Sequence, residues 1–272
     1  MDKHENLKKI QDIERNILRE FIRICDKYSL RYFLVEGSLL GAVRHKGMIP
    51  WDDDIDVALY REDYEVFMSV VRDELEECFE CQSWRWDESC IECITKIIDK
   101  RHTVRSFAKS EAFDTNVWID VFVIDGMPSG KLKKKLHRFR LLRKKLRVMW
   151  SDIDHYVTNR KRPKFEEALI RLARALHTDK IINTNRALKA LDKAMAKVKL
   201  CSDGDTVNFL SEYRFATKCK ASVYGNGSAA DFDGMSAMIP DSPSVLLEQE
   251  YGDYMALPPE ESRYKHQLEL IT

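Results

Sequence analysis

Hydrophobic residues recur every three or four positions in several long segments of the chain. In residues 4–28 and 61–77, charged residues separate the apolar positions, which predicts amphipathic helices that pack on a core. Residues 164–178 and 184–199 show the same spacing and predict two further helices. Residues 131–147 also keep this spacing, but lysine and arginine fill most of the positions between the apolar ones.

Shorter apolar runs predict strands between these helices. Residues 31–36 and 55–59 are two such runs, and residues 117–124 are apolar enough for a strand buried on both faces. Residues 79–86 and 90–98 predict a pair of strands joined by a polar turn. Helices and strands are therefore interspersed, which predicts an α/β (α+β) fold in which helices flank a mixed sheet.

The stretch from Phe33 to Leu59 joins two predicted strands through a short helix and an acidic loop. Asp52, Asp54 and Asp56 are spaced by two, so an extended backbone would set their carboxylates on one face. Carboxylates so close together repel one another and are costly to bury without a partner. Hard oxygen ligands of this kind suit Mg²⁺ or Mn²⁺, so the spacing predicts a divalent metal site.

Gly37 and Ser38 lie at the end of the first of these strands. Glycine lets the backbone approach a ligand closely, and Ser38 is expected to cap the short helix that follows, up to about His45. The N–H groups of such a turn are a natural seat for phosphate. A phosphate seat beside a metal site indicates an enzyme that transfers a phosphoryl-type group.

One charged residue interrupts the predicted central strand. Asp120 would be costly to bury alone, and a metal held together with Asp54 and Asp56 is the simplest way to neutralise it. The alternative is a structural aspartate that pairs with an arginine or caps the backbone. Asp125, which precedes Gly126, is expected to form a turn.

Four basic residues are candidates for binding the phosphates of a substrate. Arg44 follows the phosphate seat, and its planar guanidinium suits phosphate, although a solvated basic turn would explain it equally. Lys96 lies near the end of a predicted strand and is either a phosphate contact or an ordinary strand-edge charge. Arg263 and His266 lie near the C-terminus, and the alternative for Arg263 is a surface ion pair with a nearby glutamate.

Several of these motifs together resemble a known family. The run Gly-Ser-Leu-Leu-Gly-Ala-Val-Arg-His-Lys-Gly from Gly37, then Pro-Trp-Asp-Asp-Asp-Ile-Asp from Pro50, resembles the LicD family of bacterial phosphocholine transferases. Eukaryotic fukutin-related proteins are similar to that family. Residues 118–125 and 251–259 also match it, and so do Arg263 and His266, which follow the second of these segments.

The resemblance implies a nucleotidyltransferase-like fold and a metal-dependent transferase. The donor would be CDP-linked, as CDP-choline is, and phosphocholine or a similar group would pass to a hydroxyl of a cell-surface glycan or glycolipid. A functional carboxylate is implied at Asp120, where it would accept the proton of the acceptor hydroxyl. Two alternatives remain open: transfer of a nucleoside monophosphate onto a small acceptor such as an antibiotic, and a non-catalytic module that binds a glycan or nucleotide.

Length, charge and composition limit the number of domains, the kinds of binding partner and the cellular location that we expect. The 272 residues are expected to form one catalytic domain, with residues 129–199 as a helical elaboration. The chain has 45 basic and 45 acidic residues, so no nucleic-acid partner is expected. The polar N-terminus and the lack of a long apolar run predict a cytoplasmic protein. The basic helix at 131–147 is either solvated or leans on the inner face of an anionic membrane.

Four of the seven cysteines have a spacing that resembles a zinc site. Cys78, Cys81, Cys90 and Cys93 nevertheless lie in or beside strand-like sequence, where residues three apart point to opposite faces. No glycine is present there to form the tight turns that such zinc ligands need. We therefore expect free thiols, which are typical of a reducing compartment.

Overall fold

The computed structural model describes residues 3–107, 112–153, 164–263 and 268–271. Its strands are β1 (Tyr32–Leu34), β2 (Asp56–Tyr60), β3 (Phe79–Gln82), β4 (Thr95–Ser106), β5 (Phe113–Met127), β6 (Asp205–Val207), β7 (Cys219–Lys220), β8 (Ser228–Phe232), β9 (Met235–Ile239) and β10 (Leu268–Leu270). Its helices are α1 (Lys3–Lys27), α2 (Glu36–His45), α3 (Arg61–Glu74), α4 (Lys131–Ser151), α6 (Lys164–Ala175), α7 (Thr178–Ile181), α8 (Thr184–Met195), α9 (Ala221–Tyr224) and α10 (Pro243–Tyr251), with short 3-10 turns η1 (Arg214–Thr217) and η2 (Glu260–Ser262).

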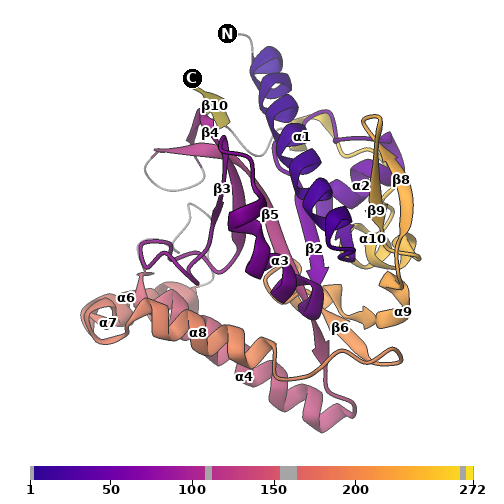
Figure 1. Ribbon diagram of the computed structural model, residues 1–272. Helices are drawn as coiled ribbons and strands as arrows, with labels where there is room; N and C mark the ends of the chain where they lie inside the picture. The colour runs from indigo at the N-terminus through magenta and orange to yellow at the C-terminus, as the bar shows by residue number, and fades with distance from the viewer. Residues whose placement is uncertain (1–2, 108–111, 154–163, 264–267, 272) are drawn as a thin grey trace.

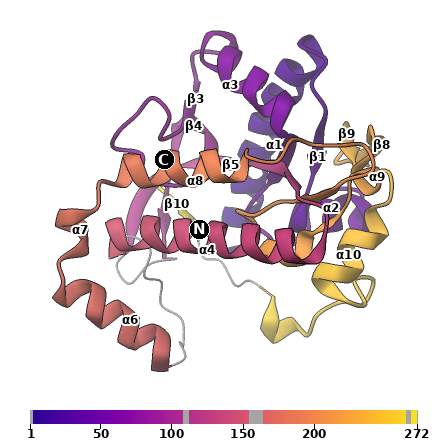
Figure 2. The ribbon, with the colours of Figure 1, turned by 90° about the horizontal axis from the view of Figure 1, so that it is seen from below.

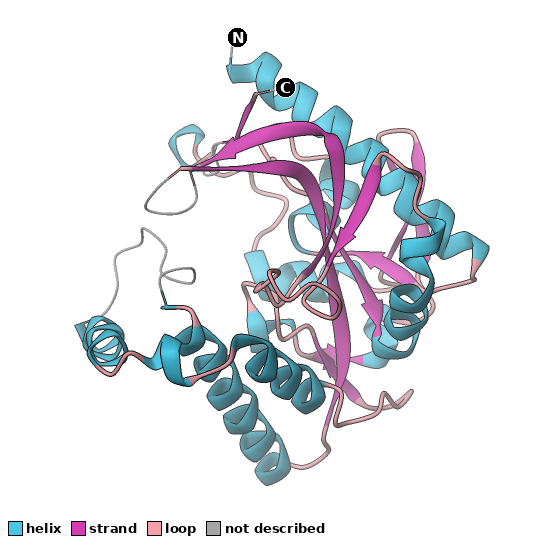
Figure 3. Ribbon diagram, turned by 60° about the vertical axis from the view of Figure 1, so that its left-hand side comes forward, coloured by secondary structure: helices cyan, strands magenta, loops and turns pink. Residues whose placement is uncertain are grey.

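The sheet is mixed. Within the described residues it has eight strands, in the order β1-β2-β5-β4-β10, with β3 beside β4 and with β6 and β7 continuing from β5. β2 and β5 run parallel, whereas β5 pairs antiparallel with β4, and β1 with β2. The long strands β4 and β5 curl through the centre of the molecule, and helices flank them (Figure 3). This α+β arrangement, like that of a nucleotidyltransferase, confirms the predicted fold class.

Two helices of the predicted kind, α1 and α3, pack on the sheet and contact each other (Figure 1). Their apolar stripes are buried, and the rings of Phe21 and Phe67 lie 5.3 Å apart between them. Near the start of α1, the Asn6 side chain donates to the carbonyl of Leu268 and accepts from the N–H of Leu270. Strand β10 is therefore tied to α1 at the edge of the sheet.

The strand pair predicted at 79–86 and 90–98 is shorter on its first side than expected. β3 ends at Gln82 and pairs with the start of β4, where Cys81 lies opposite Ile97. Residues 83–94 form turns and coil between them. The indole N–H of Trp86 donates to the carbonyl of Cys81, so this segment folds back on β3 instead of extending it.

The predicted turn at Asp125 was wrong. Asp125 lies inside β5, is almost fully buried, and accepts two hydrogen bonds from the guanidinium of Arg61, at 2.8 and 2.7 Å. Arg61 also donates to Asp192 on α8 at 2.8 Å. The following glycine does not end the strand, because β5 continues to Met127 and pairs with β6.

Helices α4, α6, α7 and α8 lie within the predicted helical elaboration. α4 and α8 pack side by side below the sheet (Figure 2). Leu141 and Val148 of α4 are buried, and so are Leu188 and Leu191 of α8. In the part of the chain that the structure describes, no helix combines the length and apolar character needed to cross a membrane.

Candidate active site

Strand pairing sets three charged residues side by side across the sheet. Asp56 is in register with Asp120 on the parallel strand β5, and Lys96 of β4 is in register with Asp120 on its other side. The N–H of Asp120 donates to the carbonyl of Ile55 at 2.9 Å. Both carboxylates are thus brought together by backbone pairing alone, from segments far apart in the sequence.

The acidic loop before β2 differs from the extended run predicted for it. Only Asp56 belongs to the strand, and residues 52–55 form an irregular coil that precedes it. In this loop one carboxylate oxygen from each of Asp52, Asp53 and Asp54 lies within 4.8 Å of the others. It is the one cluster of three possible metal ligands found among the described residues. The acids therefore gather by loop closure rather than by strand alternation.

Gly37 and Ser38 lie in the first turn of α2, which begins at Glu36 and not at Ser38 as predicted. The predicted capping role of Ser38 was wrong: Val35 is the N-cap, and the buried Ser38 hydroxyl accepts a hydrogen bond from the N–H of Asp56 at 2.9 Å. Gly37 makes room for the acidic loop, since a Cβ there would lie 2.6 Å from an oxygen of Asp52. Both residues shape the carboxylate site.

Glu36 is a site residue that the sequence analysis missed. It has a left-handed backbone (φ 51°), is 8% exposed, and lines the cavity beside Asp56. Its Oε1 has no hydrogen-bond partner in the described part of the chain. Burial, with the charges of Glu212 and Asp120, raises the pKa of Glu36 to about 7, and the Ser211 hydroxyl offsets part of this rise. The strained conformation is the signal of function, and only the structure reveals it.

The surroundings of the carboxylates in this site disfavour their negatively charged forms. Burial raises the pKa of Asp56 well above its ordinary value, and the charges of Asp54, Glu36 and Asp120 raise it further. Burial also raises the pKa of Asp120, although the ammonium group of Lys96 offsets part of the rise. Asp120 Oδ1 has no hydrogen-bond partner among the described residues. A bound cation would relieve these costs, so the donor set fits a divalent metal.

Helix α1 also contributes to the site, although its sequence indicated nothing beyond packing. The Gln11 amide donates to the carbonyls of Ile49 and Asp52, at 3.1 and 2.8 Å, and holds the acidic loop. Glu14 is buried beside this loop. Burial raises the pKa of Glu14, and the charges of the three loop aspartates at 52–54 raise it further. Hydrophobic periodicity identified the buried face of α1 but not the polar residues within it.

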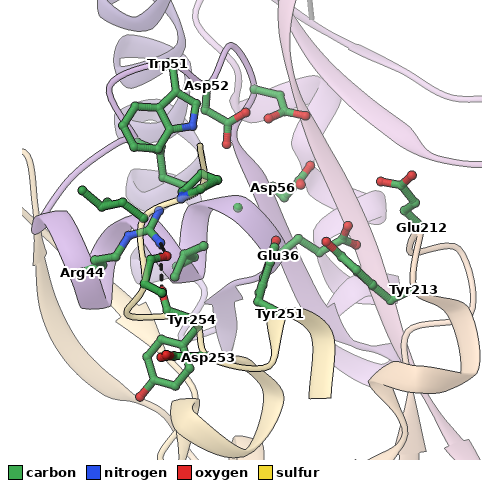
Figure 4. Close-up of a pocket in the computed structure, with 17 residues that line it drawn as sticks. Glu36, Arg44, Trp51, Asp52, Asp56, Glu212, Tyr213, Tyr251, Asp253 and Tyr254 are labelled. Carbon is green, nitrogen blue, oxygen red and sulfur yellow. Dashed lines mark hydrogen bonds between the residues drawn. The ribbon is translucent and has the colours of Figure 1, made fainter. Parts of the chain in front are cut away.

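A cavity of about 470 Å³ opens beside these acids. Figure 4 shows Glu36 and Asp56 facing it, with Trp51 and Asp52 on one side and Glu212 with Tyr213 on the other. Further lining comes from the segment after α10, which is residues 253–258. The cavity is therefore formed by four parts of the chain: α2, the acidic loop, the segment before η1 and the C-terminal segment.

Of the two arginines predicted to bind phosphate, Arg44 lines the cavity and Arg263 lies against Trp51 at its side. Arg44 donates to the carbonyls of Tyr254 and Ala256, at 2.8 and 3.3 Å. Arg263 does not form the alternative glutamate pair; its guanidinium lies 4.5 Å from the ring centre of Trp51, and it donates to a carbonyl at 3.1 Å. His266 lies outside the described residues.

Lys96 is not a strand-edge charge, because β4 has neighbours on both sides. Its ammonium group lies 2.9 Å from a carboxylate oxygen of Glu92 and 4.3 Å from the ring centre of Trp118. Asp120 faces it in register from β5. The positive charge of Lys96 therefore lowers the pKa of Asp120 and offsets part of the effect of burial.

The four cysteines with zinc-like spacing are free thiols in the structure. Cys81 is buried in β3, and the thiol of Cys90 is near enough to add to the burial that raises its pKa. Within the described part of the chain, no three of these thiols lie close enough together to share a metal ion. Thiols with raised pKa are poor metal ligands, since zinc binds the thiolate.

Comparison with known proteins identifies the class as a nucleotidyltransferase-fold transferase. Residues 29–171 match the family described as LicD/FKTN/FKRP, nucleotidyltransferase domain. The chain is 28% identical over 263 residues to lipopolysaccharide cholinephosphotransferase LicD of Haemophilus influenzae. The aligned region covers 93% of this chain and 93% of that protein. It is 45% identical over 49 residues to human ribitol 5-phosphate transferase FKRP, which covers 18% of this chain and 10% of that protein.

The family match spans more than half of the 272 residues and includes both β2 and β5. The chain therefore belongs to the LicD/FKTN/FKRP family and is a transferase. The resemblance seen in its motifs is confirmed.

Proposed function

We propose that this protein transfers phosphocholine from a CDP-linked donor to a hydroxyl of a cell-surface glycan or glycolipid, in a metal-dependent reaction at the inner face of the membrane. One observation carries the proposal: Glu36 and Asp56 are buried carboxylates that line one cavity, and Asp120 lies in register beside Asp56 with an Oδ1 that has no hydrogen-bond partner among the described residues. A site that binds a metal and a diphosphate would repay the cost of burying them. The matched relatives named for phosphocholine and ribitol phosphate transfer support the reaction type.

In this proposal Asp54, Asp56 and Asp120 hold Mg²⁺ or Mn²⁺. Such an ion, when bound, neutralises charge on the donor phosphates. Asp52 and Asp53 are further candidate ligands, because their oxygens cluster with that of Asp54. Ser38 acts indirectly, by holding the backbone from which the Asp56 side chain extends.

The reaction would be a displacement at phosphorus. The acceptor oxygen forms a bond to the phosphorus that bears the choline, the bond from that phosphorus to CMP breaks, and CMP leaves. Asp120 accepts the proton of the acceptor hydroxyl, a role that suits a carboxyl whose pKa is raised by burial. Gly37, Arg44 and Arg263 would seat the donor diphosphate, and Lys96 and His266 are the remaining candidates for phosphate contacts.

The lining of the cavity favours a cationic group on the donor. Tyr213 and Tyr251 stand edge to face, with ring centres 5.4 Å apart, and Glu36 and Glu212 line the same cavity. Aromatic faces and carboxylates are the surroundings in which proteins bind quaternary ammonium groups. Ribitol, a neutral polyol, would not neutralise these acids. We therefore propose choline as the alcohol that the donor carries.

Donor screening tests this proposal. With Mg²⁺ present, CDP-choline should raise the Tm more than CDP-ribitol, CDP-glycerol or CDP-ethanolamine, and chelation with EDTA should remove the difference. A comparison of CDP-choline with its neutral isostere, CDP-3,3-dimethylbutanol, isolates the positive charge. Equal stabilisation by these two would contradict the choline assignment and leave the transfer reaction standing.

Product analysis tests the reaction itself. Transfer of the phospho-substituent releases CMP, whereas a nucleotidyltransferase that uses a nucleoside triphosphate releases pyrophosphate. Release of pyrophosphate would replace the proposed function with nucleotidyl transfer. Binding of donor with no product from any of the four CDP-linked compounds would favour a non-catalytic binding module.

A further inference from the structure

Helix α4 turns its apolar stripe away from the protein. Leu132, Leu136 and Phe139 are 80%, 58% and 63% exposed, and Leu142 and Leu146 are also exposed. The helical spacing of these residues predicts a face packed on the core, yet they lie on the opposite side. Exposed leucine and phenylalanine in a continuous row cost free energy in water and mark an interaction surface.

A different face of α4 supplies its packing. His137, Leu141 and Val148 are buried, and they follow one another at intervals of four and seven residues. These positions fall on the far side of the helix from the exposed stripe, because each residue advances by about 100°. On its inner side, Lys134 pairs with Asp205, and Arg138 lies 4.5 Å from the ring centre of Phe215. The fold therefore holds α4 without using the outer stripe.

The charges of α4 select the kind of partner. Residues 131–151 include ten lysines and arginines and no acidic residue, although the whole chain has no net charge. Lys133, Lys135, Arg143 and Arg147 are exposed on or beside the apolar stripe. Long basic side chains of this kind bury their carbon stems and reach outward to anionic groups.

We propose that the outer face of α4 docks on an anionic lipid bilayer. The stripe would enter the boundary between the headgroups and acyl chains, and the flanking lysines and arginines would contact lipid phosphates. A second copy of the chain is a poor occupant, because it would bring two sets of ten positive charges together. The proposal deepens the membrane location given in the proposed function and rests on it. Failure of vesicle binding would remove that location, whereas the transfer chemistry is tested separately by product analysis.

Vesicle sedimentation with the 272-residue chain tests the proposal. The wild type should bind vesicles of equal parts phosphatidylglycerol and phosphatidylcholine, and bind phosphatidylcholine vesicles at least tenfold more weakly. Binding should weaken as salt is added. Comparable binding to both kinds of vesicle, or no binding at low salt, would overturn it.

Two surface variants assign the contact to α4. Leu132→Ser with Leu136→Ser and Phe139→Ser should reduce binding at least tenfold, and Lys133→Gln with Lys135→Gln should reduce it by about fivefold for each charge removed. These side chains are exposed, so circular dichroism and Tm should stay unchanged.

The matched control is Leu169→Ser with Leu172→Ser, which removes two exposed leucines from α6. It should bind like the wild type. A control that loses as much binding as the α4 variant would overturn the assignment. So would a concentration-dependent dimer in ultracentrifugation that the α4 triple variant abolishes, because the face would then belong to a second copy.

Discussion

Strand β5 carries two aspartates five residues apart, the half-buried Asp120 and the buried Asp125, and their surroundings differ. Asp125 accepts two short hydrogen bonds from Arg61, which links the strand to Asp192 on α8. Asp120 lies between Asp56 and Lys96 in the register of the sheet, and its Oδ1 has no hydrogen-bond partner in the described chain. Asp125 is paired directly with a guanidinium, whereas Lys96 only partly offsets the cost of charge on Asp120.

This difference separates a structural carboxylate from a candidate catalytic one. A carboxylate paired with a buried arginine contributes to the folded state, and its loss removes part of the charge that compensates the guanidinium. A carboxylate gathered with other acids works against the folded state, because like charges repel in a site of low dielectric. Such a cost is typical of functional sites, where a ligand supplies the missing charge. The two aspartates of β5 should therefore respond in opposite ways to the same substitution.

The largest expected effect is on turnover in Asp56→Asn and Asp54→Asn. Loss of a metal ligand should lower kcat by roughly 10³–10⁴-fold, since a bound ion contributes several kcal/mol to the transition state. The fold should survive, and the Tm of the metal-free protein should stay the same or rise because repulsion is relieved. Steady-state rates and thermal melts in EDTA check both statements, and near-native turnover in either variant would refute the metal assignment.

Asp120→Asn tests whether this residue acts chiefly as the base. In that case the variant should still bind the donor with Mg²⁺, while turnover falls by about 10²–10⁴-fold. Arg44→Ala is the contrast, because removal of a phosphate contact weakens donor binding while the carboxylates remain. Calorimetric titration of the donor separates the two. Loss of donor binding in Asp120→Asn would make it an indispensable metal ligand, and unchanged binding and rate would contradict both roles.

Asp125→Asn is the matched substitution at the second aspartate of the strand. It should destabilise the protein by about 1–3 kcal/mol, because Arg61 loses its buried charge partner but keeps Asp192 and Glu65. Denaturant unfolding measures this loss, and the residual folded enzyme should keep its affinity for the donor. A variant as stable as the wild type would remove the basis of the comparison between the two aspartates.

A smaller effect is expected for the pH dependence of stability. Glu36 titrates near pH 7 in the folded protein and near its ordinary 4.5 when unfolded. Between these values the folded state holds more protons than the unfolded state, so this contribution to stability falls as pH rises. In the metal-free protein, Glu36→Gln should therefore make the free energy of unfolding fall less steeply between pH 4.5 and pH 7. Glu62→Gln, an exposed control, should leave the slope unchanged.

The sequence alone determined much of the fold and the centre of the site. Hydrophobic spacing located α1, α3 and the central strand around Asp120, because burial of apolar side chains dictates where elements form. The pairing of a Gly-Ser turn with an acidic run identified the family, which the comparisons confirm. Asp120 was visible as a charge inside an apolar strand, and such an interruption has few physical explanations.

Tertiary structure decided which charges have partners. Asp120 and Asp125 are alike in sequence, and only the packing of α3 brings Arg61 to one and not the other. Glu36 and Glu14 joined the site through a left-handed backbone and a helix face that no local pattern marks. The stripe of α4 has the spacing of a buried face, yet contacts made elsewhere on the helix leave it exposed. Local spacing sets which residues share a face, but long-range contacts decide what that face meets.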